Sequence, residues 1–361
     1  MRDEIEARVP ALGDLEARAR DLLPLHVWDF LAGGSGDEYT VRRNASVYDA
    51  YRLRPRFLRD VSKVDITCEL LGHRLPAPFL VAPIGLQRLF HPDGELATAI
   101  GAAQADIGFI LSNASTTPLE EIADVAPPFR WFQLYWHQDR KINVDLCRRA
   151  ESAEYRAICL TVDSTTNGIP PRALRHLDRR INVEALHPKA NYIPYNEAHT
   201  SGTPEDWTRK HDPALSWKDI EWLKTQTQLP VVLKGIMTAE DARLCVDHGV
   251  SGIMVSNHGG RQLDHVAAPI EVLAEIADAV GGKLPIILDG SVRRGHDVAV
   301  SIALGACAVT IGRPAIWALV EGGAAGVTRL VKNLIDDLTT TMAGTGAASL
   351  SDLNPGFVDR A

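Results

Sequence analysis

Short runs of apolar, often β-branched residues recur along the chain, and segments with helical periodicity separate them. Because none of these runs alternates cleanly between apolar and polar residues, each is expected to be a strand buried on both faces, as in a parallel sheet. There are eight: Phe79–Pro83, Phe109–Ser112, Trp131–Tyr135, Ala157–Asp163, Pro230–Gly235, Gly252–Asn257, Pro285–Gly290 and Ala308–Pro314.

The spacing of these runs suits one strand and one helix in six of the seven intervals. Eight strand–helix units predict an α/β protein with a closed (β/α)8 barrel, the TIM barrel; an open doubly wound sheet is the alternative. Helix starts are predicted at Thr117, with Thr117 as N-cap and Pro118 in the first turn, and at Thr238. Another helix should open near His296.

The chain is expected to form one barrel domain over residues 1–361, with two additions. Residues 1–60 should form an N-terminal helical cap on the bottom or side of the barrel, with helical periodicity over Asp14–Gly34. After the fourth run, a long gap holds an insertion at 178–218, a candidate lid over the catalytic face. A disordered or subunit-contacting loop is the alternative. Thr328–Met342 predicts the last helix, followed by a tail from Gly344.

Composition places the chain among ordinary globular proteins. Hydrophobic residues make up 45% and charged residues 23% of the 361 residues, and the net charge is −8. This charge argues against nucleic acid as a partner. The five scattered cysteines favour a reducing compartment, and no apolar run approaches membrane length, so we expect a cytoplasmic protein with no membrane partner.

Polar residues gather at the carboxyl ends of the predicted strands, where barrels place catalytic groups. They are Ser112, Gln133, Tyr135, Thr161, Asp163, Lys234, Ser256, Asn257, His258, Asp289, Arg293 and Arg313. No metal site is expected, because His91, His137, His187, His199 and His211 lack ligand spacing and are interpreted as surface or loop residues.

The densest cluster is Ser256–Asp264, with the sequence SNHGGRQLD. A histidine followed by two glycines can approach a ligand closely, and an arginine three residues later can meet a carboxylate. This run resembles the active-site motif of the FMN-dependent α-hydroxy-acid oxidase and dehydrogenase family. Segments at 27–34, 81–85, 289–295 and 311–314 extend the resemblance, and Trp131–Trp136 is similar to its lactate 2-monooxygenase branch.

The resemblance implies FMN as cofactor, and the barrel's usual phosphate site after strands seven and eight agrees with it. A Rossmann fingerprint is absent. The helix opening near His296 should add its positive N-terminal end to the phosphate site. The residues implied to contact FMN are Ala82, Pro83, Ile84, Ser112, Gln133, Thr161, Lys234, Ser256, Asp289, Gly290, Ser291, Arg293, Gly312 and Arg313.

The same resemblance assigns catalytic roles. His258 should accept a proton as the substrate is oxidised, by hydride transfer or through a carbanion, and Asp163 should hold the charged imidazole. Tyr135 should hydrogen-bond the substrate oxygen, and Lys234 should stabilise the reduced flavin. Arg261 should bind an anionic substrate group.

Two positions depart from the family pattern in the substrate pocket. Phe30 stands where the family usually has a tyrosine that contacts the substrate carboxylate, and Pro170 stands where it has an arginine. Losing both donors should disfavour lactate or glycolate unless Arg172, Arg175 or His176 compensates. A bulkier, less acidic or differently anchored substrate is therefore expected.

The leading hypothesis is FMN-dependent oxidation of a 2-hydroxy acid or a related α-substituted carbonyl compound, with O2 as acceptor. Oxidation of an amine or alcohol intermediate in a biosynthetic pathway is the alternative, favoured by Phe30 and Pro170. A non-redox FMN barrel and a binding-only homologue are further alternatives. The resemblance also implies a homotetramer.

Overall fold

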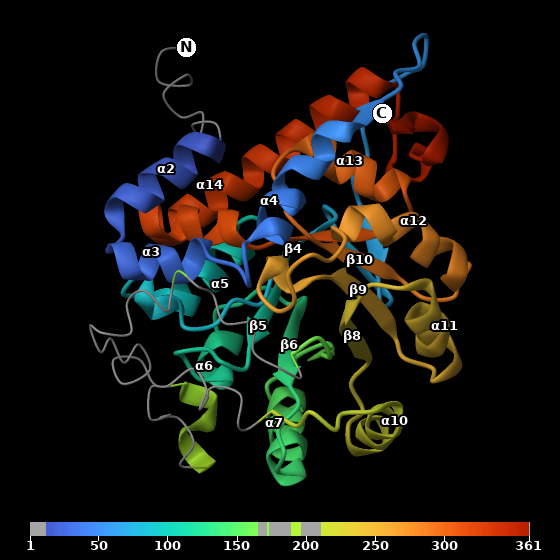
Figure 1. Cartoon of the computed structure of the whole chain (residues 1–361). Coiled ribbons are helices and arrows are strands. Elements are labelled where there is room, and N and C mark those ends of the chain that lie inside the picture. The colour runs from blue at the N-terminus through green and yellow to red at the C-terminus, as the bar shows by residue number, and fades with distance from the viewer. Residues whose placement is uncertain (1–11, 165–171, 173–188, 196–210, 361) are drawn as a thin grey trace.

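Eight parallel strands close into a barrel at the centre of the molecule (Figure 1). This computed structural model describes residues 12–164, 172, 189–195 and 211–360. All eight predicted runs are strands, and the last pairs with the first, so the closed barrel is confirmed and the open sheet is excluded. The strands are β4 (Phe79–Val81), β5 (Gly108–Ser112), β6 (Arg130–Tyr135), β7 (Ile158–Thr161), β8 (Val231–Ile236), β9 (Gly252–Ser256), β10 (Ile286–Asp289) and β11 (Ala308–Ile311).

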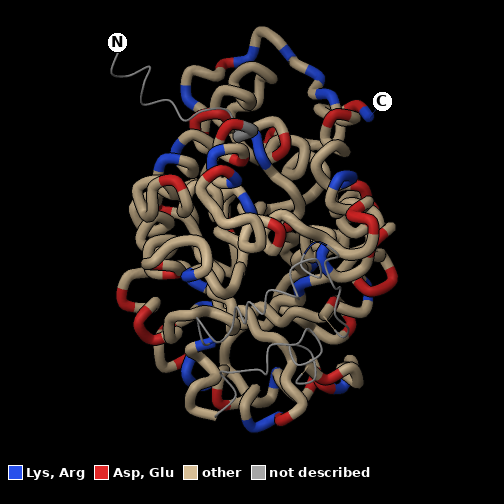
Figure 2. Tube along the Cα trace, turned by 60° about the vertical axis from the view of Figure 1, so that its left-hand side comes forward, with Lys and Arg blue, Asp and Glu red and all other residues tan. Residues whose placement is uncertain are grey.

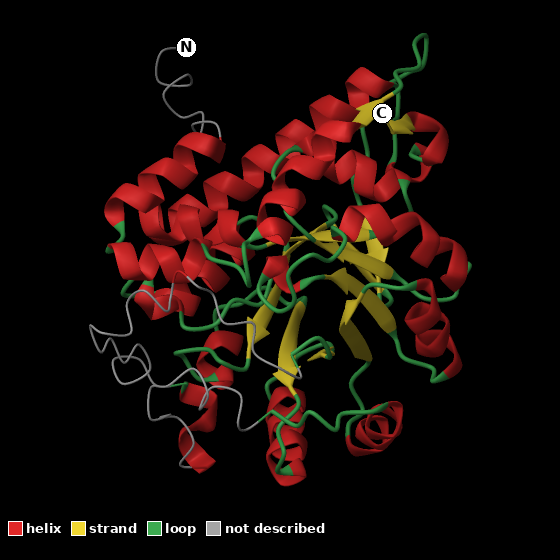
Figure 3. Ribbon diagram, viewed as in Figure 1, coloured by secondary structure: helices red, strands yellow, loops and turns green. Residues whose placement is uncertain are grey.

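Helices surround the barrel on its outside (Figure 3). They are α5 (Gly94–Gln104), α6 (Leu119–Ala123), α7 (Arg140–Ser152), α10 (Trp217–Gln226), α11 (Ala239–Asp247), α12 (Pro269–Val280), α13 (Gly295–Ala303) and α14 (Arg313–Thr345). Thr238 caps α11 as predicted, with its side chain accepting a bond from the backbone of Asp241. The predicted Thr117 cap is wrong, because α6 begins at Leu119 and Pro118 occupies the N-cap position.

The N-terminal segment forms α2 (Leu12–Leu22), α3 (Leu25–Ala32), α4 (Tyr39–Ser46) and the 3-10 turn η1 (Val47–Ala50). The helical stretch predicted over Asp14–Gly34 is two helices, because Pro24 has an extended ψ of 141° and starts α3. The expected place at the bottom or side is wrong for part of the segment. Ser35 donates its backbone N–H to Gly260, which follows β9 at the carboxyl end of the barrel.

The C-terminal region is more ordered than the predicted tail. Helix α14 spans 33 residues, from Arg313 to Thr345, so it starts well before the predicted Thr328–Met342, and it bends where Gly323 adopts a φ of 55°. Two 3-10 turns follow, η6 (Leu350–Asp352) and η7 (Pro355–Phe357). They are followed by β12 (Val358–Arg360), which pairs antiparallel with β1 (Tyr51–Leu53) and so joins the C-terminal region to the segment that follows the N-terminal helices.

A β-hairpin, β2 (Cys68–Leu70) and β3 (His73–Leu75), closes the amino end of the barrel. Leu70 and Leu75 of this hairpin pack in one buried cluster with apolar side chains from the barrel strands. These are Leu80, Ile110, Trp131, Ala157, Cys159, Val232, Met254, Ile287 and Ala308. The lower barrel is therefore a dry core.

The polar groups lie two residues beyond these apolar ones, and side chains repeat on one strand face every two residues. Ile110 is followed in this way by Ser112, Val232 by Lys234, and Ile287 by Asp289. Gln133, Thr161, Ser256 and Thr310 occupy the equivalent positions on the neighbouring strands. The inward faces therefore change from apolar to polar toward the carboxyl end, where the site lies.

The outer surface shows no grouping of charge by sign, because acidic and basic positions are interspersed along the outer helices (Figure 2). Among the described residues, every helix is too short or too polar to span a membrane.

Candidate active site

His258 lies in a strained turn directly after β9. Its φ is 58°, and Gly259 and Gly260 follow with φ of 63° and 76°, so three consecutive residues adopt the left-handed region. Only glycine and a few polar residues visit this region readily. The Ser256 hydroxyl accepts the His258 backbone N–H at 3.0 Å, and the Asn257 side chain accepts that of Gly260 at 3.2 Å. The turn is held so that the imidazole faces the barrel mouth.

Both ring nitrogens of His258 have partners. Nδ1 lies 2.8 Å from Oδ1 of Asp163, and Nε2 lies 3.2 Å from the hydroxyl of Tyr135. When Nδ1 carries the proton, it donates to Asp163, and Nε2 is left as the basic nitrogen. Gly235 makes room for this pair, because a Cβ there would lie 2.7 Å from the Cβ of Asp163. The arrangement can accept a proton at Nε2 and stabilise the resulting charge.

The Asp163 carboxylate is suited to that task. Burial alone would raise its pKa, but the charge and hydrogen bond of His258 together with the charge of Lys234 hold the pKa below its usual value. Its second oxygen, Oδ2, is buried and lacks a hydrogen-bond partner in the described structure. Asp163 therefore stays ionised beside the imidazole.

Lys234 is the second charged group of the barrel interior, and it is almost fully buried. Its ammonium lies 2.8 Å from both the Ser256 hydroxyl and the Asp289 carboxylate. Burial opposes its charge, but Asp289 and Asp163 together raise its pKa. Asp289 also accepts bonds from Ser256 and Thr310, each at 2.6 Å. Burial alone would raise the pKa of Asp289, but the charge of Lys234, with these hydrogen bonds, lowers it to about 2. The lysine is thus a fixed cation at the barrel mouth.

A neutral polar chain runs across the opposite strands. The Ser112 hydroxyl donates to Oε1 of Gln133 at 3.0 Å, and Nε2 of Gln133 donates to the hydroxyl of Thr161 at 3.0 Å. All three side chains are buried. These groups and Lys234 form a layer of fixed donors and acceptors that suits the polar edge of a flat heterocycle.

Three arginines gather on the other side of the mouth. Arg313 donates to the carbonyl oxygens of Leu31, Gly33 and Gly259, and burial with the charges of its arginine neighbours lowers its pKa to about 9. Arg261 donates to the carbonyls of Phe30 and Gly33, and burial lowers its pKa as well.

Arg293 lies 3.7 Å from the Glu16 carboxylate, the one ion pair that these arginines form within the described chain. Burying several guanidinium groups close together, with one carboxylate partner among them, costs free energy unless an anion binds between them. The cluster therefore fits the phosphate of FMN, and the polar layer fits its ring. Arg293, Arg313 and the backbone at Gly312 would hold the phosphate.

One part of the predicted phosphate site is wrong. The helix near His296, which is α13, is expected from the sequence to add its positive N-terminal end to the phosphate site. Asp297 accepts the backbone N–H groups of Arg293 and Arg294, and Asp337 accepts that of Gly295 at 2.6 Å. The positive end of this helix is therefore already neutralised by two carboxylates.

The Phe30 ring lies between one charged neighbour, Arg261, and one aromatic neighbour, Phe90. The guanidinium carbon of Arg261 lies 5.1 Å from the centre of its ring, and the Phe90 ring stacks on it at 6.3 Å. The ring therefore forms an apolar wall beside Arg261 and offers no hydroxyl. Pro170, the second departure, lies outside the described residues, as do Arg175, His176, His187, His199 and most of the 178–218 insertion.

The remaining predicted FMN contacts lie on the loops at the same end of the barrel. Ala82, Pro83 and Ile84 follow β4, and Gly312 follows β11, where a Cβ would lie 3.9 Å from the Cβ of Ala82. Gly290 and Ser291 follow β10. Ser291 has a φ of 53°, and a Cβ at Gly290 would lie 2.7 Å from the Pro269 side chain. That these residues contact the cofactor stays a prediction.

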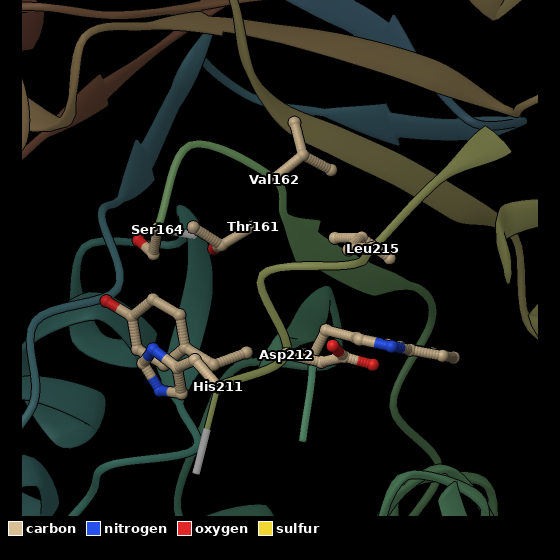
Figure 4. A pocket seen from close by; sticks show the side chains of 8 residues that line it. Thr161, Val162, Ser164, His211, Asp212 and Leu215 are labelled. Atoms are coloured by element: carbon tan, nitrogen blue, oxygen red, sulfur yellow. The ribbon is translucent and has the colours of Figure 1, made fainter. Parts of the chain in front are cut away.

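His211 is a site residue that sequence reasoning missed, since it was interpreted as a surface or loop residue. Its ring stacks on Tyr135 with 4.8 Å between ring centres, and its Nδ1 is buried without a hydrogen-bond partner in the described structure. Both rings line a cavity of about 10 Å³ behind the end of β7, beside Thr161 and Leu215 (Figure 4). His137 is also buried rather than exposed. No sequence signal marked either residue.

Burial of His211 predicts a pH effect. Burial, helped by the charge of Lys189, lowers its pKa from 6.5 to about 4. Between these values the unfolded chain binds a proton that the folded chain does not, so stability should fall as the pH drops through this window, by up to about 3 kcal/mol. Melting temperatures of wild type and His211→Gln between pH 7 and 4.5 test this. A variant with the same pH slope as wild type would contradict it.

Sequence reasoning also missed three residues that support the site: Thr310, Asn44 and Glu38. Thr310 bonds Asp289, Asn44 exchanges two amide hydrogen bonds with Asn257, and Glu38 forms an ion pair with Arg172 at 2.5 Å. Thr310 could have been found from the two-residue strand period alone. The partners of Asn44 and Glu38 are more than 130 residues away along the chain, and no local pattern marks them.

The chain resembles known proteins over nearly its whole length. Residues 19–360 match the sequence family described as FMN-dependent dehydrogenase. The chain is 41% identical to an L-lactate oxidase of Nostoc sp. over 96% of this chain and 97% of that protein. It is 42% identical to glycolate oxidase 1 of Zea mays, over 94% and 93% of the two chains.

Solved structures are similar throughout. A mandelate oxidase crystallised with (S)-4-hydroxymandelic acid superposes with a TM-score of 0.91 at 41% identity, over 97% of this chain and 98% of that chain. A mutant flavocytochrome b2 with pyruvate bound superposes with a TM-score of 0.88 at 35% identity, over 97% and 86% of the two chains.

Proposed function

This chain belongs to the FMN-dependent dehydrogenase family, and we propose that it oxidises a 2-hydroxy acid or a related α-substituted carbonyl compound with O2 as electron acceptor. Membership makes it an oxidoreductase with FMN as its cofactor. The observation that carries the proposal is the imidazole of His258, with one nitrogen on Asp163 and the other facing Tyr135 at the barrel mouth.

Each residue has a separate task in this mechanism. Nε2 of His258 takes one proton from the substrate, and the ionised Asp163 stabilises the imidazolium. The Tyr135 phenol, whose pKa burial raises to about 12, stays protonated and can donate to the substrate oxygen. Arg261 anchors an anionic or carbonyl group of the substrate. Lys234 supplies a fixed positive charge where negative charge develops on reduction.

The electron balance is simple. FMN, when bound, accepts the two electrons that leave the substrate. Oxidation of a 2-hydroxy acid to a 2-oxo acid releases two electrons and two protons, and reduction of O2 to hydrogen peroxide takes up the same number. No further reactant is needed.

Anaerobic mixing with a panel of substrates tests the proposal. The panel holds short and aromatic 2-hydroxy acids, matched alcohols without a carboxylate, and amines. We expect at least one 2-hydroxy acid to bleach the visible flavin absorbance, and admitted air to restore it with release of peroxide. Bleaching by no member of the panel would favour a non-redox or binding-only protein.

A second candidate is oxidation of an alcohol or amine that lacks a carboxylate. The apolar wall formed by Phe30 favours it, since this ring offers no hydrogen bond to a carboxylate. The same panel separates the two candidates, because bleaching by the alcohols or amines alone would support the second one.

Phe30→Tyr should improve the oxidation of short 2-hydroxy acids. The added hydroxyl can donate to the substrate carboxylate, and a hydrogen bond to a charged group is worth about 1.5–3 kcal/mol, so kcat/KM for lactate should rise about tenfold or more. Phe57→Tyr adds the same hydroxyl to an exposed ring and is the matched control. An unchanged kcat/KM in Phe30→Tyr would show that this ring does not limit carboxylate binding.

We also propose that the protein is a cytoplasmic homotetramer, as the family resemblance implies, with the 178–218 insertion acting as a lid. Light scattering on the purified protein tests the oligomeric state, and proteolysis at the insertion with and without an active-site inhibitor tests the lid.

A further inference from the structure

Glu95 is a fully buried carboxylate that the mechanism does not use. It lies in the first turn of α5, and its two oxygens accept three hydrogen bonds from two different loops. Oε1 accepts the backbone N–H groups of Gln87 at 2.9 Å and Thr116 at 3.0 Å, and Oε2 accepts the Thr116 hydroxyl at 2.5 Å. One side chain therefore joins the loop after β4 to the loop after β5.

These two loops touch through their backbones. Leu86 donates its N–H to the carbonyl of Ala114 at 3.1 Å, and Leu86 itself has a left-handed φ of 57°. A Cβ at Gly85 would lie 2.8 Å from the Cβ of Ala114 and 2.9 Å from its carbonyl oxygen. The loops fit together without spare room, so a shift of one must move the other.

The junction reaches the proposed flavin contacts through Gln87. The Gln87 side chain donates to the carbonyl of Ile84 at 2.9 Å and accepts the hydroxyl of Thr98 at 2.6 Å. Ile84 follows Ala82 and Pro83 on the first loop, and on the second loop the Ser112 hydroxyl accepts the backbone N–H of Ala114 at 3.2 Å. Glu95 is thus bonded directly to one residue of each loop, Gln87 and Thr116, and Gln87 in turn bonds Ile84.

This carboxylate has no compensating cation, since within the described chain it forms no ion pair. Burial raises its pKa, and the bonds from Thr116 and Gln87 oppose that shift. A buried acid held only by neutral donors is costly, and an apolar side chain would fill the same volume at less cost. Its hydrogen-bonding geometry is therefore the property that distinguishes it from an apolar residue at this position.

We propose that Glu95 is a positioning residue that clamps the β4 and β5 loops together and thereby sets the affinity and environment of the bound flavin. The proposal rests on the proposed function, because it takes Ala82–Ile84 and Ser112 as flavin contacts. Glu95 itself acts through Gln87 and Thr116 and touches no reacting atom.

Glu95→Met keeps the length of the side chain and removes both acceptors, whereas Glu95→Gln keeps one carbonyl oxygen for the two N–H groups and an amide for the Thr116 hydroxyl. FMN dissociation constants, from quenching of FMN fluorescence, and visible spectra of the bound flavin are the readouts. Glu95→Met should bind FMN about tenfold more weakly with a shifted spectrum. Glu95→Gln should restore both readouts to near wild type.

Asp219→Leu is the matched control, because Asp219 is also a buried first-turn carboxylate that accepts a backbone N–H, from Ser216, but far along the chain from both loops. It should lower the melting temperature and leave the FMN dissociation constant unchanged. If Glu95→Met is insoluble, Thr116→Val and Thr116→Ser replace it, and the valine variant alone should weaken FMN binding.

Wild-type affinity and spectrum in Glu95→Met, or in Thr116→Val, would overturn the proposal, as would equal weakening in Asp219→Leu. If wild type binds FMN and the variants give one of these contradicting results, the Glu95 proposal fails and the proposed function is unaffected. A wild-type protein that binds no FMN would overturn both.

Discussion

His258→Asn should lower kcat/KM by more than about 4 kcal/mol of transition-state stabilisation, which is about a thousandfold, and leave FMN bound. The variant loses the basic Nε2 nitrogen. Asparagine is chosen because residue 258 has a φ of 58°, which asparagine tolerates better than alanine does. The loss can therefore be assigned to chemistry and not to a distorted turn. Stopped-flow bleaching of the flavin by the best substrate of the panel is the measurement.

His265→Asn is the matched control for this experiment. His265 also has a left-handed φ, of 57°, and lies on the same loop, but it is exposed and stacks on Tyr39 outside the site. Its substitution should leave bleaching unchanged. Turnover of His258→Asn close to that of wild type would remove His258 from the role of base.

Lys234→Met should destabilise the fold by about 3–5 kcal/mol. The ammonium lies 2.8 Å from the Asp289 carboxylate, so the two buried charges are paired in wild type. Removing the ammonium leaves the buried carboxylate without a cation. Asp163 also loses a charge that keeps its pKa low. Chemical denaturation of wild type and variant compares the two free energies of unfolding, and Lys224→Met, which removes an exposed lysine, is the control.

The double variant Lys234→Met with Asp289→Asn sharpens this test. It removes both charges, so it should be more stable than Lys234→Met alone, because no carboxylate is left without a cation at this position. If the double variant is less stable than wild type by the sum of the two separate effects, the pair is not coupled and the described network is not what holds the lysine.

The barrel was predictable because its strands are buried on both faces and recur with nearly even spacing. The two-residue period within each apolar run is hard to see in the sequence, because the outward positions that pack on the helices are apolar as well. Thr310 was missed for this reason, although it follows Ala308 just as Lys234 follows Val232. Reading alternate positions from the strand start would have found it.

The remaining misses depend on contacts between distant segments. His211 stacks on Tyr135 from a segment 76 residues later, so its burial cannot be read from neighbouring residues. Helix α13 illustrates the opposite error. Its N-terminus follows a phosphate-type loop, yet Asp297 and Asp337 occupy its N–H groups, and the second of these carboxylates comes from α14. Only tertiary packing decides which partner such groups take.

FMN should bind at this barrel mouth, beside the imidazole of His258. Titration of the purified apoprotein with FMN, followed by visible absorption, tests it most directly. We expect saturable binding of one FMN per chain with a perturbed flavin spectrum. A protein that stays colourless and leaves the spectrum of added FMN unchanged would contradict it.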